Sequence, residues 1–170
     1  MAARARLAAK GLSFSMRELA TDAGVNLGLI HKHLGNKEDV VRAVLARNNA
    51  RSAAAIQGID SLPEAVHRLF LVGVADPQYV RIVAWLILHD RVDLLPNSDA
   101  DEIAAITRLS SPSVDGRVRL MTALSAIAGW SLFGDGILRS SEIPDEAHRM
   151  YENHIAELLS AIVQDEDRAN

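Results

Sequence analysis

Residues 15–40 read SMRELATDAGVNLGLIHKHLGNKEDV and carry the start and stop signals of consecutive short helices. Ser15, followed three residues later by Glu18, forms a capping-box pattern, in which each side chain bonds the backbone amide of the other residue. Gly24 can end the first helix because glycine tolerates the positive φ of a tight turn. Asn26 is then placed to cap a second helix. The stretch therefore predicts two short helices joined by a tight turn.

The remaining sequence also has a helical pattern. Apolar residues make up 49% of the 170 residues and recur at three- and four-residue spacing, whereas strand-like alternation is absent. We expect an all-α protein of about nine helices, divided into residues 1–50 and residues 51–170. Ser61 and Glu64 repeat the capping-box spacing just after this boundary, at the start of a further helix.

Charge is distributed unevenly along the chain. Residues 1–51 contain nine Lys or Arg and four Asp or Glu, a balance of +5, and residues 52–170 contain nine and eighteen, a balance of −9. A basic segment attached to an acidic one suggests that the basic segment meets a polyanion, although chance clustering on a solvated surface gives the same count.

Several classes of protein are disfavoured by composition. The chain has no cysteine, which removes disulfides, thiolate metal sites and cysteine nucleophiles. The first ten residues are basic and lack the apolar run of a signal peptide, and the longest apolar stretch is too short to span a bilayer. We therefore expect a cytoplasmic protein with no membrane association.

The two short helices and their turn fit a helix-turn-helix, a motif whose second helix enters the major groove of DNA. An ordinary helical hairpin with a glycine turn is the plainer alternative. The segments SMRELA (15–20), AGVNLG (23–28) and HLGNKEDV (33–40) resemble the TetR family of bacterial repressors, whose pattern is AGVSxGx, then a hydrophobic residue and YxHFx[SN]KExL. This chain has His31 in place of the usual Tyr and Leu34 in place of Phe.

The resemblance and the positions together predict a DNA-binding surface. Lys32 and Lys37 are expected to neutralise phosphates, and Lys37 also lies at a helix N-terminus, where free amides favour anions. Ser15 and Arg17 are expected to contact the DNA backbone. Leu29 is expected to contact a thymine methyl group. The full set of predicted DNA-binding residues is Ser15, Arg17, Asn26, Leu27, Gly28, Leu29, His31, Lys32, His33 and Lys37.

One helix-turn-helix reads few base pairs, so we expect a homodimer on a palindromic operator. The two long C-terminal helices are the expected interface, as a four-helix bundle, unless their apolar stripes only fill the core of one subunit. The interface residues expected are Leu120, Ala123, Leu124, Ile127, Ile155, Leu158, Leu159 and Ile162.

The resemblance also implies a pocket for a small-molecule effector in the C-terminal part. Trp85 and His89 are four residues apart and share one helix face with Arg81, which would suit a polar or anionic ligand. Aromatic residues at helical spacing are, however, often plain core. The pocket residues expected are Phe70, Tyr79, Arg81, Trp85, His89, Trp130 and Phe133.

No constellation for catalysis is evident. The six histidines form no metal-ligand pair, and no phosphate-binding glycine loop or nucleophile elbow is present. We expect no enzyme, no metal and no cofactor. The sequence thus predicts a ligand-responsive transcriptional repressor. Its main alternative is a ligand-binding or interaction protein of the same fold that has lost DNA binding, and a weaker one is an enzyme on an all-helical scaffold.

Overall fold

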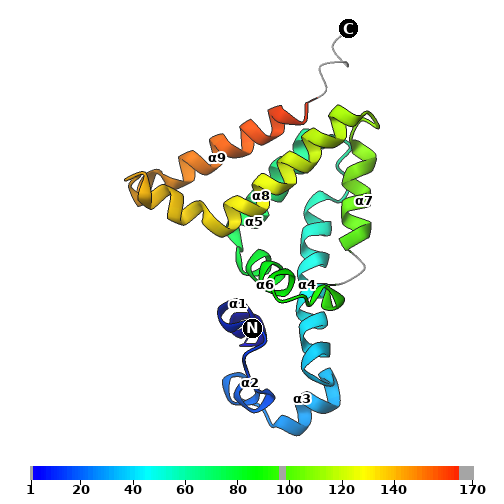
Figure 1. Ribbon diagram of the computed structural model, residues 1–170, viewed down its shortest axis with the longest axis vertical. Coiled ribbons are helices and arrows are strands. Elements are labelled where there is room, and N and C mark those ends of the chain that lie inside the picture. Colours follow the sequence, from blue (N-terminus) through cyan, green and yellow to red (C-terminus); the bar gives the residue numbers. More distant parts are fainter. Residues whose placement is uncertain (1, 96–98, 165–170) are drawn as a thin grey trace. The chain divides into compact units, whose positions relative to one another are not determined.

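The computed structural model describes residues 2–95 and 99–164. Within these residues the protein consists of nine α-helices and one short 3-10 helix, with no strand (Figure 1). The predicted all-α fold class is confirmed. The elements are α1 (Ala2–Lys10), α2 (Met16–Ala23), α3 (Leu27–Leu34), α4 (Lys37–Ile56), α5 (Leu62–Ala75), α6 (Gln78–Leu88), η1 (Val92–Leu94), α7 (Asp99–Leu109), α8 (Val114–Ser140) and α9 (Asp145–Ile162).

The start of α5 corrects one prediction from the sequence. Ser61 occupies the N-cap position of α5, but its side chain makes no capping hydrogen bond. Ser113 does cap α8, because its hydroxyl accepts a hydrogen bond of 3.0 Å from the Gly116 amide. The two serines differ in backbone orientation, with ψ of 121° at Ser61 and 157° at Ser113. The capping-box spacing at Ser61 was therefore not sufficient to form the cap.

The first compact unit comprises Met1–Arg51 and Gln78–Asp99. Helix α6 packs against α1, and the indole of Trp85 lies directly on the backbone of Gly11. A Cβ atom at Gly11 would lie 1.8 Å from the Trp85 ring, so only glycine fits there. Helices α1, α2, α3, α4 and α6 all contribute to the buried core of this unit. Its buried residues are Leu7, Phe14, Leu19, Ala20, Ile30, Val40, Val41, Leu45, Ile82, Leu86 and Leu94.

This unit is larger than the sequence predicts. We expected residues 1–50 to stand apart from residues 51–170, yet Gln78–Asp99 packs with the N-terminal helices. The physical reason is apolar burial, since Ile82 and Leu86 of α6 share a core with Leu7 of α1. Periodicity along α6 shows that one face is apolar, but it does not show which helix covers that face. The functional domain boundary stays a prediction.

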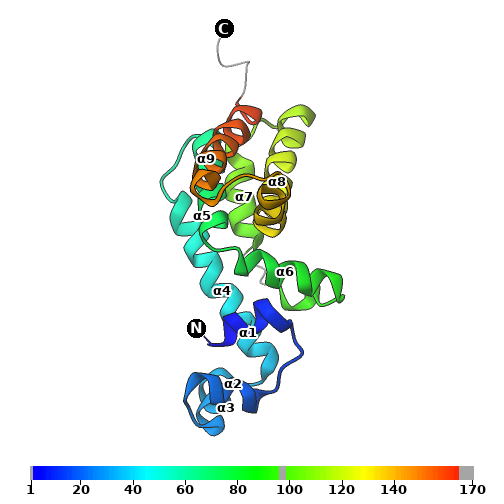
Figure 2. The same cartoon turned by 90° about the vertical axis from the view of Figure 1, so that its left-hand side faces the viewer.

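The second compact unit comprises Ser52–Pro77 and Ala100–Asn170. Helix α5 packs against both α8 and α9 (Figure 2). The crossing of α5 and α8 is close, because a Cβ atom at Gly73 would lie 2.9 Å from Ser131 Oγ. The buried core of this unit contains Leu62, Val66, Leu69, Phe70, Ile106, Leu120, Ala123, Ala156, Leu159 and Val163.

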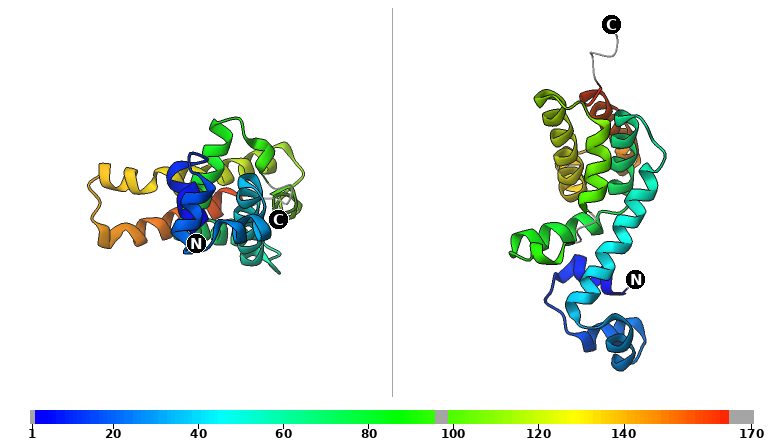
Figure 3. Two further views of the ribbon diagram at one scale, coloured as in Figure 1. Left: turned by 90° about the horizontal axis from the view of Figure 1, so that it is seen from below. Right: turned by 90° about the vertical axis from the view of Figure 1, so that its right-hand side faces the viewer.

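Helices α8 and α9 follow each other through a short turn and form a hairpin (Figure 3). Helix α8 is long and apolar enough to cross a membrane by length and composition, the one such helix among the described residues apart from a bent pair formed by α5 and α6. One such helix is weak evidence for a membrane span, because core helices pass the same test; 28% of the apolar window of α8 is buried. The length and hydropathy of α8 therefore carry little weight for membrane insertion.

Candidate nucleic-acid interface

Local hydrogen bonds determine the geometry of α2 and the turn that follows it. The Ser15 hydroxyl accepts a hydrogen bond from the Glu18 amide at 3.2 Å, and the Ser15 amide donates to Glu18 Oε2 at 2.7 Å. The capping box predicted from the sequence is therefore confirmed. Gly24 adopts φ 64°, and its amide donates to the carbonyls of Ala20 and Thr21. These bonds end α2 and turn the chain toward α3.

Asparagine side chains begin the next two helices. Asn26 Oδ1 accepts a hydrogen bond from the Gly28 amide at 2.7 Å at the start of α3. Asn36 Oδ1 accepts from the Glu38 and Asp39 amides at 2.8 and 3.1 Å at the start of α4. These side-chain bonds define where α3 and α4 begin.

Most predicted DNA-binding residues lie on the exposed surface of this motif. Leu29 is 50% exposed, whereas Ile30 of the same short helix is buried. His31 is exposed, and its Nδ1 lies 3.1 Å from the Gly35 carbonyl, so one of its ring nitrogens is engaged locally. The exposed members of the predicted set are Ser15, Arg17, Asn26, Gly28, Leu29, His31, Lys32 and His33.

Two predicted contacts lie in different surroundings. Leu27 is partly buried and packs against the core of its unit. Lys37 is also partly buried: its ammonium donates a hydrogen bond to the Leu12 carbonyl and lies 4.8 Å from the centre of the Phe14 ring. Lys37 therefore joins the start of α4 to the segment before α2. Its predicted phosphate contact stays a prediction and would have to share the ammonium group with these partners.

Negative charge beside the interface is paired with Arg6 of α1, a residue that sequence reasoning missed. Its guanidinium donates to both carboxylate oxygens of Asp22, and Nη1 lies 3.4 Å from Glu18 Oε1. Hydrogen bonding to Arg6 lowers the pKa of Asp22, and hydrogen bonds from Ser15 together with the charge of Arg6 lower that of Glu18. Both acids of α2 are thus held ionised and paired. No local pattern predicts pairing across twelve or sixteen residues.

Arg91 was also missed, and it connects the end of α6 to the start of α4 within the first unit. Its Nη2 lies 2.5 Å from Glu38 Oε1, and its Nε lies 3.0 Å from Asp93 Oδ1. These hydrogen bonds raise the pKa of Arg91 above its ordinary value and lower that of Asp93. The ion pairs link helices that are 53 residues apart in sequence.

The seven residues predicted to line an effector pocket are divided between the two compact units. Tyr79 and Trp85 pack against the first core, and Trp85 stacks on His89 at 3.9 Å between ring centres, as their shared helix face suggested. Phe70 is buried in the second core, where its ring lies 6.4 Å from that of Trp130. Arg81 and Phe133 are exposed, Phe133 by 63%. Neither unit by itself brings the seven together, because Phe70 and Trp85 serve different cores.

The residues predicted for the dimer interface are mostly part of the core of one subunit. Leu120, Ala123 and Leu159 are buried in the second unit, and Leu124, Ile127, Ile155 and Ile162 pack against them. Leu158 alone of the predicted set is largely exposed, at 61%. The other seven residues pack within the chain's own core, which was the alternative interpretation of the apolar residues on α8 and α9. The apolar residues on the exposed sides of α8 and α9 are instead Val114, Val118, Met121, Phe133, Ile137, Met150, Tyr151 and Leu158.

Comparisons with known proteins agree with this motif. Residues 1–44, which span α1 to the first turns of α4, match the bacterial regulatory proteins of the tetR family. The fold is similar to that of the candidate transcriptional regulator SCO4942 from Streptomyces coelicolor, with a TM-score of 0.66 and 19% identity over 93% of each chain. No curated protein matches the sequence. Residues 1–44 therefore resemble the N-terminal domain of the tetR-family regulators, and the chain as a whole shares its fold with the SCO4942 protein.

Proposed function

We propose that this protein binds a specific DNA sequence through α3 and thereby represses transcription. The observation that carries the proposal is the exposed surface of α3, where Leu29, Lys32 and His33 are accessible and residues 23–37 include no acid. The two acids of the preceding helix are paired with Arg6, which reduces repulsion of phosphates. A basic, locally rigid helix with an apolar reader suits the major groove.

We expect the protein to recognise its DNA site both by direct contacts with the bases and by the shape of the DNA. Leu29 is suited to a thymine methyl group, and His33 can donate to or accept from a base edge. Gly28 permits close approach of the α3 backbone. Because the polar readers are few, sequence-dependent DNA shape is expected to add to specificity.

Selection of binding sites from random duplexes tests the proposal. We expect enrichment of a palindrome with two half-sites about one helical turn apart. Failure to enrich any sequence, with no salt-dependent binding to duplex DNA, would instead favour a protein of this fold that has lost DNA binding.

Charge variants test the surface itself. Lys32→Ala is expected to weaken binding equally for all sequences and to reduce the slope of log K against log salt by about 1. Arg68→Ala is the matched control, because Arg68 lies on α5 and pairs with Glu64 at 2.8 Å. If the salt dependence of DNA binding has the same slope in both variants, Lys32 does not contact the DNA.

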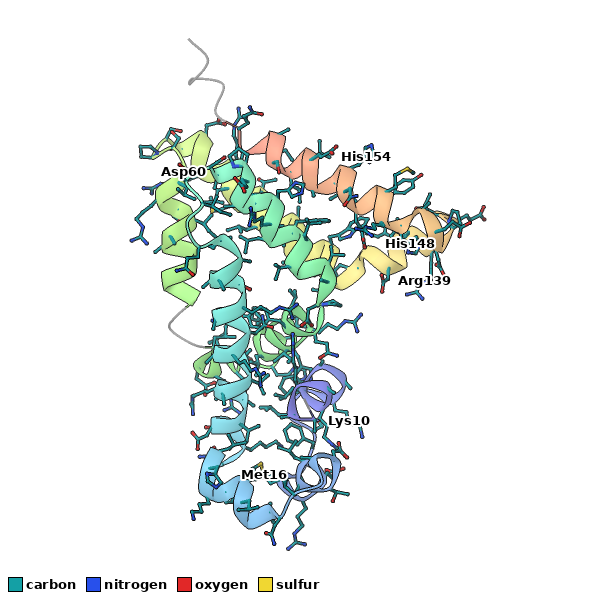
Figure 4. All side chains as sticks on the ribbon, turned by 180° about the vertical axis from the view of Figure 1, so that it is seen from behind. Lys10, Met16, Asp60, Arg139, His148 and His154 are labelled. Carbon is teal, nitrogen blue, oxygen red and sulfur yellow. The ribbon has the colours of Figure 1, made fainter. Side chains whose placement is uncertain are left out.

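A homodimer is proposed to form through the exposed sides of α8 and α9. Val114, Val118 and Met121 follow each other at three- and four-residue spacing on α8, and Tyr151 and Leu158 lie on α9. Figure 4 labels His154, which lies between these two residues of α9 in the sequence. An apolar surface of this kind is typical of association sites. Gly129 and Gly136 have open space around their Cβ positions, which allows a second helix to approach closely.

Leu158→Glu tests this interface by analytical ultracentrifugation. Two glutamates brought near a two-fold axis repel each other, so we expect a monomer with unchanged helical circular dichroism. Ile87→Glu, which alters a comparably exposed residue of the first unit, is the control. A dimer that survives Leu158→Glu at micromolar concentration would place the interface elsewhere.

A small-molecule effector remains part of the proposal on the strength of the family resemblance. The binding site of the effector and the direction of its effect on DNA binding are expectations of the same kind. So is the cytoplasmic location of the protein. A thermal-shift screen of metabolites, followed by DNA binding with each stabilising compound, tests whether such a ligand exists. A stabilising compound that leaves DNA affinity unchanged would not be an effector.

A further inference from the structure

A groove runs along the first compact unit between α1 and α4. Its volume is about 550 Å³, within the range of sites for small organic ligands. It is lined by side chains from α1, from the last residue of α3 and from the middle of α4, namely Ala3, Arg4, Leu34, Val40, Ala43, Val44, Arg47, Asn48 and Arg51.

The floor of this groove is apolar. Leu34 is 43% exposed although Ile30 of the same helix is buried, Ala43 is exposed and Val44 is partly buried. Covering such side chains releases water and is favourable by roughly 25 cal/mol per Å² of apolar surface. An occupant of the groove would therefore gain from a hydrocarbon portion.

The rim of the groove is cationic. Arg47 and Arg51 are four residues apart on α4 and so share one side of the helix. Arg4 of α1 faces them, with its Nη2 donating a hydrogen bond of 2.8 Å to Asn48 Oδ1. The nine lining residues include no Asp or Glu. Arg47 is exposed beside this apolar floor, and its guanidinium is complementary to an anion that carries an apolar group.

We propose that the groove binds an amphipathic anion, a carboxylate attached to a hydrocarbon chain or ring. The carboxylate accepts hydrogen bonds from Arg47 at the rim, and the hydrocarbon covers Leu34, Ala43 and Val44. A phosphate of DNA or a free inorganic anion would use the rim and leave the floor exposed. Since Leu34 is the last residue of α3, the ligand would border the recognition helix, and the proposal does not depend on any pocket in the second unit.

Amide NMR of the full-length protein tests the proposal with decanoate, kept below its micelle-forming concentration. We expect saturable shifts of backbone amides in residues 34–51. Decanol carries the same chain without charge, and inorganic phosphate carries charge without a chain, so each is expected to cause much smaller shifts at equal concentration. Equal shifts with decanol, equal shifts with phosphate, or decanoate shifts confined to residues outside the groove would each overturn the proposal.

Variants of one rim residue sharpen the test, with the dissociation constant for decanoate as the readout. Arg47 is exposed, so Arg47→Gln is expected to fold normally and to weaken decanoate binding about tenfold. Arg47→Lys keeps the charge and should restore part of the loss. Arg42→Gln is the matched control, because Arg42 lies on the same helix, pairs with Glu38 and Asp39 and does not line the groove. Unchanged affinity in Arg47→Gln would overturn the proposal.

Discussion

Helices α2 and α3 and helices α8 and α9 are built by different kinds of interaction. The first pair is short and begins with side-chain caps at Ser15 and Asn26 that bond amides two or three residues away. The second pair is longer: α8 has a side-chain cap at Ser113, whereas Pro144 at the N-cap of α9 makes no capping bond. The position of this second pair depends on packing against α5, which is distant in sequence. Local bonds thus define where a helix lies along the chain, whereas packing defines which side of it is buried.

The largest expected effect comes from removing packing in the second unit. Phe70 is 1% exposed, so Phe70→Ala should lower the free energy of unfolding by about 3–5 kcal/mol. Each unit contains one tryptophan, Trp85 in the first and Trp130 in the second. Urea unfolding followed by each fluorescence signal, with the other tryptophan changed to Phe, measures the two units separately. An equal loss at both probes would show that the units unfold together and would break the comparison.

The next largest loss of stability is expected where the Trp85 ring lies against Gly11 in the first unit. Gly11→Ala places a Cβ atom against the Trp85 ring at a residue with φ 54°, and overpacking together with this backbone conformation should cost about 3 kcal/mol. Gly24→Ala has a similar φ of 64° but open space, so about 1 kcal/mol is expected. Urea midpoints give the difference. Identical losses would mean that backbone conformation, and not the contact with Trp85, explains Gly11.

The caps offer a smaller and sharper test. Ser15→Ala removes the acceptor for the Glu18 amide and should cost about 1 kcal/mol. Ser61→Ala replaces an N-cap residue without a capping bond and should change thermal stability very little. A comparable loss of stability in Ser61→Ala would contradict the absence of a capping bond at Ser61.

The smallest effect is expected from acid. The carboxylate of Glu18 accepts a hydrogen bond from the Ser15 amide, which lowers the pKa of Glu18 below its ordinary value of 4.5. A group with a lowered pKa in the folded state stabilises it above that ordinary value, and the contribution disappears as the pH falls through the folded-state pKa. The stability difference between the wild type and Glu18→Gln should therefore shrink below pH 4.5. A difference that is constant with pH would show that the ionised carboxylate adds nothing.

The candidate interface was predicted well wherever short-range chemistry decides the structure. The capping box at Ser15, the turn at Gly24 and the cap at Asn26 all form as the sequence indicates. Lys37 shows the limit, because its position at the start of α4 was predictable but its contacts with Leu12 and Phe14 were not. Those partners lie more than twenty residues away, and no periodicity connects them.

The C-terminal helices show the same limit on a larger scale. The apolar residues of α8 and α9 were evident from the sequence, but Leu120 and Leu159 belong to the buried core and Leu158 to the exposed side. Both sides of α8 carry apolar residues, so periodicity has little power to choose between them. Contact with α5 selects the buried side.

The sequence by itself determined that this protein is helical, that α2, a tight turn and α3 form a helix-turn-helix, and that the basic residues concentrate in its first third. These properties follow from backbone amides, caps and charges that act within a few residues. Only the tertiary structure decided that α6 packs with α1, that Trp85 and Phe70 serve different cores, and that Arg6 pairs with the acids of α2. Such choices depend on which surfaces bury each other, and that is a property of the folded chain as a whole.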